Sequence, residues 1–269
     1  MAGYTTGENG AINGVPCLRR YRVISTASPA TGVCSASGGG QFAMPGNTDF
    51  RAVAVAYGVE PPATAQPGEE FTFTAFDGGV GFTSTNAYVD KVRMFWNVED
   101  ADMLYYELYF SGNGVLTADD SAVDATTASP VSAMGMGATI DDEAFDIRRA
   151  MLEISCPGVP FVDSASTSGI TEREKGNYTA SFEIEAYTKA DLPTKNALVS
   201  FTIDALVADD DAWDLDYMLI TEAASEMVKG DQQGRGVGNA CKLKGIWSAY
   251  SDDEQGHILT PADSYIFGS

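Results

Sequence analysis

Apolar and polar residues alternate along much of this chain with a period of two, which is typical of β-strands with one buried face. Ala52, Ala54 and Ala56 share one face of a predicted strand, and Val53 and Val55 share the other. The same alternation predicts strands at residues 18–26, 71–75, 91–98, 104–110, 182–186, 201–203, 213–219 and 241–249. Turn residues separate these runs, so the sequence predicts a mainly β, antiparallel fold.

A short motif occurs twice in the same order. Ser35-Ala36-Ser37 precedes Gly46-Asn47 and a strand, and Ser164-Ala165-Ser166 precedes Gly176-Asn177 and a second strand. The copies lie 129 residues apart at the first serine (35 to 164) and 130 apart at the glycine (46 to 176). Weaker collinear matches extend on both sides, and such self-similarity indicates a tandem duplication. We therefore expect two tandem, homologous antiparallel β-barrel or sandwich units, each with at most one short helix.

The repeat sets the expected domain boundaries. Helix-favouring residues at 221–229 stop at Gly230, a residue typical of a helix C-terminus. Low-complexity sequence rich in Ala, Ser, Thr and Gly separates the units. The expected segments are a flexible N-terminal arm (1–14), a first β unit (15–122), a linker or extended arm (123–140) and a second β unit (141–269).

One face differs between the two copies of the same strand. The positions of Val53 and Val55 are occupied in the second copy by Glu183 and Glu185. Burying an unpaired carboxylate is costly, so this face should be wet in the second unit. We expect Val53 and Val55 to be covered by the sister unit or another subunit, and Glu183 and Glu185 to form an acidic lumen or solvent-facing surface.

Charge and hydropathy exclude several classes of protein. The 269 residues carry a net charge of −22, whereas non-specific nucleic-acid binding requires clustered basic groups. The longest basic cluster is Arg19-Arg20, so we expect repulsion from DNA and from anionic membranes. No apolar run reaches 18 residues and the N-terminus lacks the features of a secretory signal, so we expect no membrane anchor. Four cysteines are interpreted as free, mostly buried thiols, with a Cys17–Cys34 bridge as the alternative.

The sequence offers no convergent catalytic or metal-binding set. The single histidine, His257, lies in a turn-like segment, and one histidine cannot build a histidine-based metal site. The acidic clusters, such as Asp209-Asp210-Asp211, lie in predicted turns and lack the spacing of an EF-hand. We expect a protein that is not an enzyme and has no catalytic residues, no metal and no cofactor.

The order of features in the first unit resembles the tail tube (major tail) proteins of long-tailed bacteriophages. The resemblance rests on the strand at 18–26, the Ser35-Ala36-Ser37 motif, the turn at 46–50, the Pro67-Gly68-Glu69-Glu70 turn, and the closing strand and Gly-Asn-Gly turn at 106–117. It covers most of the first unit and, more faintly, the second. The second unit departs from it, with Leu192-Pro193-Thr194-Lys195 near the position of the Pro-Gly turn and an enlarged segment before the last strand.

This resemblance implies a virion structural protein that assembles in the host cytoplasm. Tube proteins stack as rings commonly built from six tube domains, so a chain with two domains would form a trimeric ring with pseudo-sixfold symmetry. The implied partners are the chain itself, within a ring and between stacked rings, other tail proteins, and DNA that passes through without specific binding. Excess acid suits a channel that must not hold DNA. Long loops or arms at 1–14, 61–70, 78–90, 123–146 and 230–240 would supply ring and stack contacts.

Two other classes fit the sequence. A capsid decoration or head-surface protein is also β-rich, acidic and oligomeric. A two-domain β binding module, such as an adhesin, would display exposed aromatic residues on loops, for which Phe82 and Tyr88 are the candidates.

Overall fold

The structure is a computed structural model that describes residues 2–5, 10–33, 41–58, 61–62, 64–76, 80–98, 103–113, 116–119, 123, 132, 137–162, 170–188, 192–204, 212–227 and 239–247. Its strands are β1 (Ala2–Thr5), β2 (Ala11–Ile12), β3 (Leu18–Val33), β4 (Gln41–Tyr57), β5 (Glu70–Phe76), β6 (Gly81–Asn97), β7 (Tyr105–Asn113), β8 (Thr117–Ala118), β9 (Gly137–Ile140), β10 (Glu143–Ser155), β11 (Gly158–Val162), β12 (Ile170–Lys175), β13 (Thr179–Thr188), β14 (Leu198–Asp204), β15 (Ala212–Met227) and β16 (Asn239–Trp247). The prediction of a mainly β, antiparallel fold is confirmed, and the described residues contain no helix.

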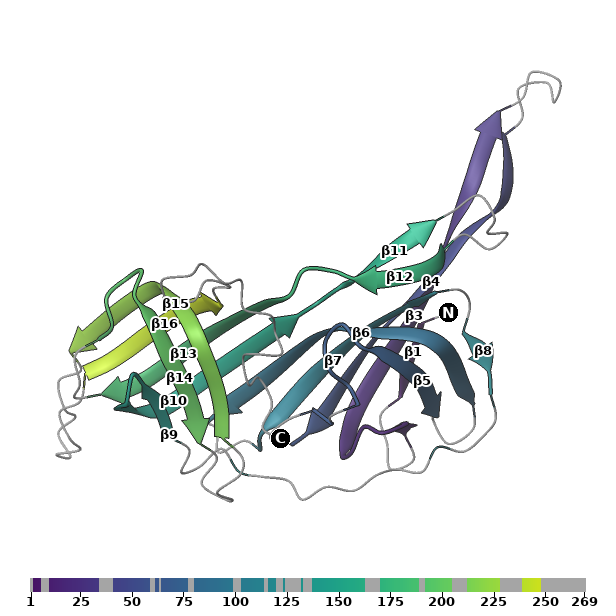
Figure 1. The fold of residues 1–269 in the computed structure, drawn as a ribbon. Helices are drawn as coiled ribbons and strands as arrows, with labels where there is room; N and C mark the ends of the chain where they lie inside the picture. Colours follow the sequence, from purple (N-terminus) through teal and green to yellow (C-terminus); the bar gives the residue numbers. More distant parts are fainter. Residues whose placement is uncertain are drawn as a thin grey trace.

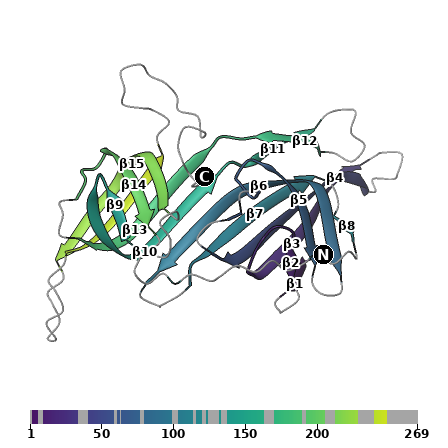
Figure 2. The same ribbon diagram turned by 60° about the horizontal axis from the view of Figure 1, so that its bottom comes forward.

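Fourteen of the strands form one continuous sheet. Its main path runs β1-β3-β4-β7-β6-β10-β13-β16-β15-β14-β9, and β9 also pairs with β10. The last six strands of this path therefore close into a six-stranded antiparallel barrel, which lies at one end of the molecule (Figure 1). At the other end, β1, β3, β4, β7 and β6 form a strongly curved sheet, and β5 pairs with β6 (Figure 2).

The two halves of the chain follow the same strand order. The path β3-β4-β7-β6-β5 in the first half corresponds to β10-β13-β16-β15-β14 in the second. The β3–β4 pairing slips between Leu18 and Arg20, and the β10–β13 pairing slips between Ile147 and Arg149, which are the positions 129 residues later. A β-bulge changes the direction of a strand at a defined residue. Because the two bulges lie at matching positions, they show which residues of the first half correspond to which residues of the second.

Strands β6 and β10 join the halves. Seven consecutive residue pairs connect them, from Arg149 opposite Asn97 to Ser155 opposite Lys91. One hydrophobic cluster continues across this joint, because Met94 and Trp96 of β6 and Leu152 and Ile154 of β10 are all buried in it. The halves therefore share a sheet and a core.

Two long hairpins extend away from the sheet. The outer ends of β3 and β4 form one arm, and β11 pairs with β12 to form a second arm that runs in a similar direction (Figure 1). The arms correspond in register, because Thr31 lies opposite Ala43 in the first and Pro160 lies opposite Arg173 in the second. The prediction of a turn at Gly46-Asn47 is wrong, since both residues lie within β4 and the hairpin continues beyond them.

Three other expectations about local structure need correction. The predicted helix at 221–229 is a strand as far as Met227, because β15 pairs with β16 along its whole second part. The N-terminal segment is not wholly a free arm, since Ala2–Thr5 pair with β3 and both Ala11 and Ile12 are buried. Gly137–Ile140, assigned to the linker, form the strand that closes the barrel.

The expected loop at 78–90 is also mostly strand. Residues from Gly81 onward belong to β6, and Tyr88 is buried in the chain. Tyr88 therefore does not supply the exposed loop aromatic expected of an adhesin. Several predicted features lie outside the described residues: Ser35-Ala36-Ser37, Ser164-Ala165-Ser166, Cys34, Asp209-Asp210-Asp211, Gly230 and His257.

Candidate functional site

The sheet has one face that carries most of its charged side chains, here called the charged face. It crosses eight strands, from β3 through β4, β7, β6, β10, β13 and β16 to β15, and residues directly opposite each other in the ladder place its side chains on one side. It bears Arg20, Arg22, Val53, Val55, Glu107, Tyr109, Lys91, Arg93, Glu153, Arg149, Glu183, Glu185, Lys242, Lys244 and Glu222.

Glu183 and Glu185 lie on this face, on the barrel, where two lysines of β16 face them. Lys242 Nζ lies 2.5 Å from Glu183 Oε1 and 3.5 Å from Glu185 Oε1, and Lys244 Nζ lies 3.6 Å from Glu183 Oε2. The hydrogen bond from Lys242 lowers the pKa of Glu183 and raises the pKa of Lys242. The two carboxylates are half-buried and neutralised, so they do not form an acidic patch of their own.

The same arrangement recurs at the joint between the halves. Glu153 of β10 accepts a hydrogen bond from Arg93 of β6 and lies 3.7 Å from Lys91 Nζ. The Tyr109 hydroxyl donates to Glu107 at 2.7 Å, and Lys91 Nζ lies 4.4 Å from the centroid of the Tyr109 ring. Burial, with the hydrogen bond to Glu107, raises the pKa of Tyr109. Opposite charges on adjacent strands therefore support the joint as they support the barrel.

Val53 and Val55 occupy the first-half positions that correspond to Glu183 and Glu185. Val55 lies opposite Glu107 and is only 3% exposed, whereas Val53 lies opposite Tyr109 and is half-buried. Val55 therefore needs no second subunit to remove it from water. The role of Val53 in a subunit interface stays a prediction.

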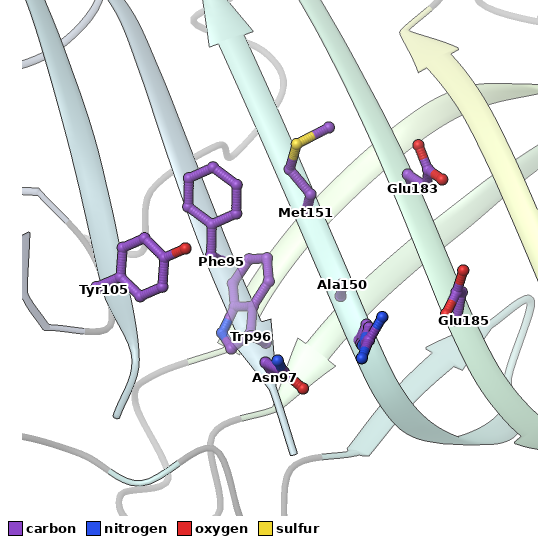
Figure 3. Close-up of a pocket in the computed structure, with 9 residues that line it drawn as sticks. Phe95, Trp96, Asn97, Tyr105, Ala150, Met151, Glu183 and Glu185 are labelled. Atoms are coloured by element: carbon purple, nitrogen blue, oxygen red, sulfur yellow. The ribbon is translucent and has the colours of Figure 1, made fainter. Parts of the chain in front are cut away.

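A pocket of about 380 Å³ lies over the joint, because Phe95 and Met151, which are opposite each other in the β6–β10 ladder, both line it. Figure 3 shows Phe95, Tyr105 and Met151 on one side of it and Glu183 and Glu185 on the other. The rings of Phe95 and Tyr105 stack with their centroids 4.8 Å apart. The lining thus combines an apolar wall with Arg149 and with two carboxylates that are paired with Lys242.

A buried arginine fixes the second arm to the first half. Arg173 of β12 is 6% exposed, and its guanidinium reaches residues of β4 and β7 that are 60 to 124 positions earlier in the chain. Nη2 donates to Asp49 Oδ1 at 2.7 Å, Nε donates to Asn113 Oδ1 at 2.7 Å, and Nη1 donates to Ser111 Oγ at 3.1 Å. We call this set the Arg173 clamp.

Further polar contacts extend the clamp. Asp90 Oδ1 accepts hydrogen bonds from Ser111 Oγ at 2.7 Å and from the backbone N–H of Gly158 at 3.0 Å. Lys175 Nζ lies 2.5 Å from Glu69 Oε1 at the exposed rim. A planar guanidinium satisfied on several sides is suited to a buried ion pair, so the clamp holds the two halves in one orientation.

The thiols do not point to chemistry. Cys156 and Cys241 are free and buried, and burial raises the pKa of both. A raised pKa reduces the thiolate that would act as nucleophile or metal ligand. The described residues contain no group of three or more histidine, cysteine or acidic side chains able to hold a metal ion. None of them forms a helix long and apolar enough to cross a membrane.

No protein-family model matches this chain, and no curated protein is similar to it. Sequence reasoning found Glu183 and Glu185 and the face they share with Val53 and Val55. It missed Arg173, whose only sequence signal is an isolated arginine within a strand bounded by charged residues.

Proposed function

We propose that this chain is a virion structural protein that self-assembles into stacked rings, forming the tail tube through which bacteriophage DNA passes. The carrying observation is the β6–β10 joint, where two halves of the same strand order meet edge to edge in one sheet. A joint of this kind is head-to-tail, because different edges of equivalent units meet. Head-to-tail contacts generate rings when the rotation between units closes.

We also propose that the two halves are tandem homologous units. The matched strand order, the matched bulges at Leu18/Arg20 and Ile147/Arg149, and the matched arm register support this duplication. A ring of three chains would then contain six equivalent units.

The electrostatics support a channel that does not retain DNA. The chain carries a net charge of −22. This charge repels phosphate groups within about one Debye length, which is roughly 8 Å at physiological salt. On the charged face, Lys91, Arg93, Lys242 and Lys244 are all in ion pairs with carboxylates. Paired cations are poorly placed to displace counterions from DNA, so these four side chains offer no strong phosphate contact.

Negative-stain electron microscopy of the concentrated protein tests the proposal. We expect rings or tubes on the order of ten nanometres across, from the size of several domains arranged in a circle. Monomers that persist at every concentration would contradict it. Binding to preformed phage heads without ring formation would instead indicate a head-surface protein, and glycan binding by a stable monomer would indicate an adhesin.

A further inference from the structure

The charged face runs across eight strands, with β3 at one end and β15 at the other. In the matched strand order of the two halves, β3 corresponds to β10 and β15 corresponds to β6, and β6 and β10 are the two strands of the joint. Within the chain, β6 presents residues 91–97 to β10. The β6–β7 pairing slips between Val89 and Lys91, and the β15–β16 pairing slips between Ile220 and Glu222. When these two slips are aligned, Glu222 of β15 corresponds to Lys91 of β6. Beyond Ile220, β16 is the only described strand that pairs with β15, and no described strand pairs with the other edge of β15, here called its outer edge.

The joint and the outer edge of β15 differ in how deeply their side chains are buried. Val92 and Met94 of β6 are fully buried beside β10. Their counterparts in β15 are Ala223 and Ser225, and both are exposed. The whole run from Thr221 to Ser225 is exposed, although it is backbone-paired on its other side. Natural proteins rarely leave a strand edge of this length uncovered, since it is a template for pairing with another chain.

The opposite end of the path is covered by a short strand. The counterpart of β10 is β3, and its outer edge pairs with β1, with Ala2 opposite Ile24 and Thr5 opposite Tyr21. The four residues of β1, Ala2–Thr5, therefore pair with the edge of β3. At the corresponding edge of β10, the pairing strand is the long strand β6. A four-residue edge strand has few ladder hydrogen bonds and is readily exchanged for a longer one.

We propose that β15 of one copy of this chain replaces β1 on β3 of the next copy, so that β1 covers the assembly edge until a second copy displaces it. In the joint, Glu153 lies opposite Arg93. Ile24 of β3 corresponds to Glu153, and Ala224 of β15 corresponds to Arg93, so the proposed contact places Ile24 opposite Ala224. The same register places Ser25 opposite Ala223 and Thr26 opposite Glu222. This inference rests on the proposed function and names the interface and its regulation. The contact is head-to-tail, so each copy keeps one edge for each neighbour.

Cysteine cross-linking between two different variants tests the register. Ile24→Cys is mixed with Ala224→Cys under mild oxidation, so that a heterodimeric disulfide can arise only between copies. Directly opposite residues in a sheet bring their Cβ atoms within reach of a disulfide. The control mixes Ile24→Cys with Ala223→Cys, because a shift of one residue sends the second side chain to the other face.

We expect at least about tenfold more heterodimer from the first mixture than from the control, in line with the alternation of faces along a strand. Equal or absent cross-linking in both mixtures overturns the inference. If rings form by electron microscopy while the first mixture does not cross-link, the proposed function stands and this interface is wrong. If neither rings nor cross-links form, both fail.

A reversible lock tests the exchange of β1. In the double variant Tyr4→Cys/Arg22→Cys, the two positions lie opposite each other in the β1–β3 register, so oxidation ties β1 to β3 within one chain. We expect the oxidised variant to remain monomeric by light scattering and the reductant to restore assembly. An oxidised variant that assembles as well as the reduced one overturns the role of β1. Wild-type protein under the same oxidant controls for the native cysteines.

Discussion

The joint between the halves and the two outer edges of the same sheet, on β3 and β15, have corresponding strands but different side-chain support. At the joint, Arg173 from the second arm reaches Asp49 and Ser111. In the proposed contact between copies, the arm formed by β3 and β4 takes the place of the arm formed by β11 and β12, and it carries Ala43 at the position of Arg173. The second half of the neighbouring copy carries Thr179 and Ile246 at the positions of Asp49 and Ser111.

This difference separates a permanent contact from one that can form after folding. The joint has the ladder, a shared core and a buried ion pair. In our proposal, the outer contact has the ladder but lacks the clamp. A contact of lower intrinsic stability suits assembly from folded chains, because each copy must remain soluble until its neighbours arrive.

The cores of the two halves also differ at one pair of opposite residues, where the large and the small side chain have changed strands. Ala52 of β4 lies opposite Phe110 of β7, whereas at the corresponding ladder position Phe182 of β13 lies opposite Gly245 of β16. A Cβ added to Gly245 would lie 2.3 Å from Cε1 of Phe182. The large residue has moved to the other strand, so each half fills the same space with a different pair.

The largest expected effect is at the clamp. Arg173→Ala should lower the free energy of unfolding by about 4 kcal/mol, because removing one partner of a buried pair leaves Asp49 without its compensating charge. Urea denaturation measures the change. Arg51→Ala, on an exposed side chain of β4, should change stability by less than about 0.5 kcal/mol. Equal effects of the two substitutions would mean that the clamp does not fix the joint.

The next effect is in the core of the barrel. Phe182→Ala should lower the free energy of unfolding by about 3 kcal/mol through the cavity that it leaves. Gly245→Phe alone should also destabilise, by overpacking against Phe182. The double variant reproduces the Ala52–Phe110 pair of the first half, so it should be more stable than the sum of the single effects by at least about 1 kcal/mol. Additive losses in a double-mutant cycle would contradict the equivalence of the two positions.

The smallest effect concerns the ion pairs of the barrel. The pKa of Glu183 is lowered below its ordinary value of 4.5, so its contribution is present above that pH and is lost as the pH falls through the lowered value. Glu183→Gln should therefore lower stability by less than about 1 kcal/mol at neutral pH, because the pair is partly exposed. The difference from wild type, measured by denaturation, should shrink towards zero in acid.

A matched control for this pair is Glu174→Gln, at an exposed position of β12. It should change stability little at either pH. A difference between Glu183→Gln and wild type that grows on acidification would have the wrong sign for a carboxylate stabilised by lysine.

Alternation predicted the strands and their buried faces well, because burial of one face leaves a period of two in the sequence. It failed where local propensity and tertiary context disagree. Residues 221–227 contain helix-favouring alanine and glutamate, yet pairing with β16 holds them in a strand. Gly46-Asn47 resembles a turn but lies within a hairpin that continues past it.

The candidate site was only partly accessible to sequence reasoning. The repeat located Glu183 and Glu185 against Val53 and Val55, since a fixed offset needs no structure. The lysines that neutralise the carboxylates lie 57 to 61 residues away and become neighbours only through the β13–β16 ladder. Arg173 meets Asp49 across 124 residues, a pairing that no local pattern encodes.

A cryo-electron microscopy reconstruction of the assembled protein tests the central claim most directly. We predict that the sheet continues from β15 of each chain to β3 of the next with the ordinary strand spacing of about 4.8 Å, repeating the β6–β10 joint around a closed ring. Rings in which these two edges lie apart, with β1 still paired to β3 and the arms alone making contact, would contradict it.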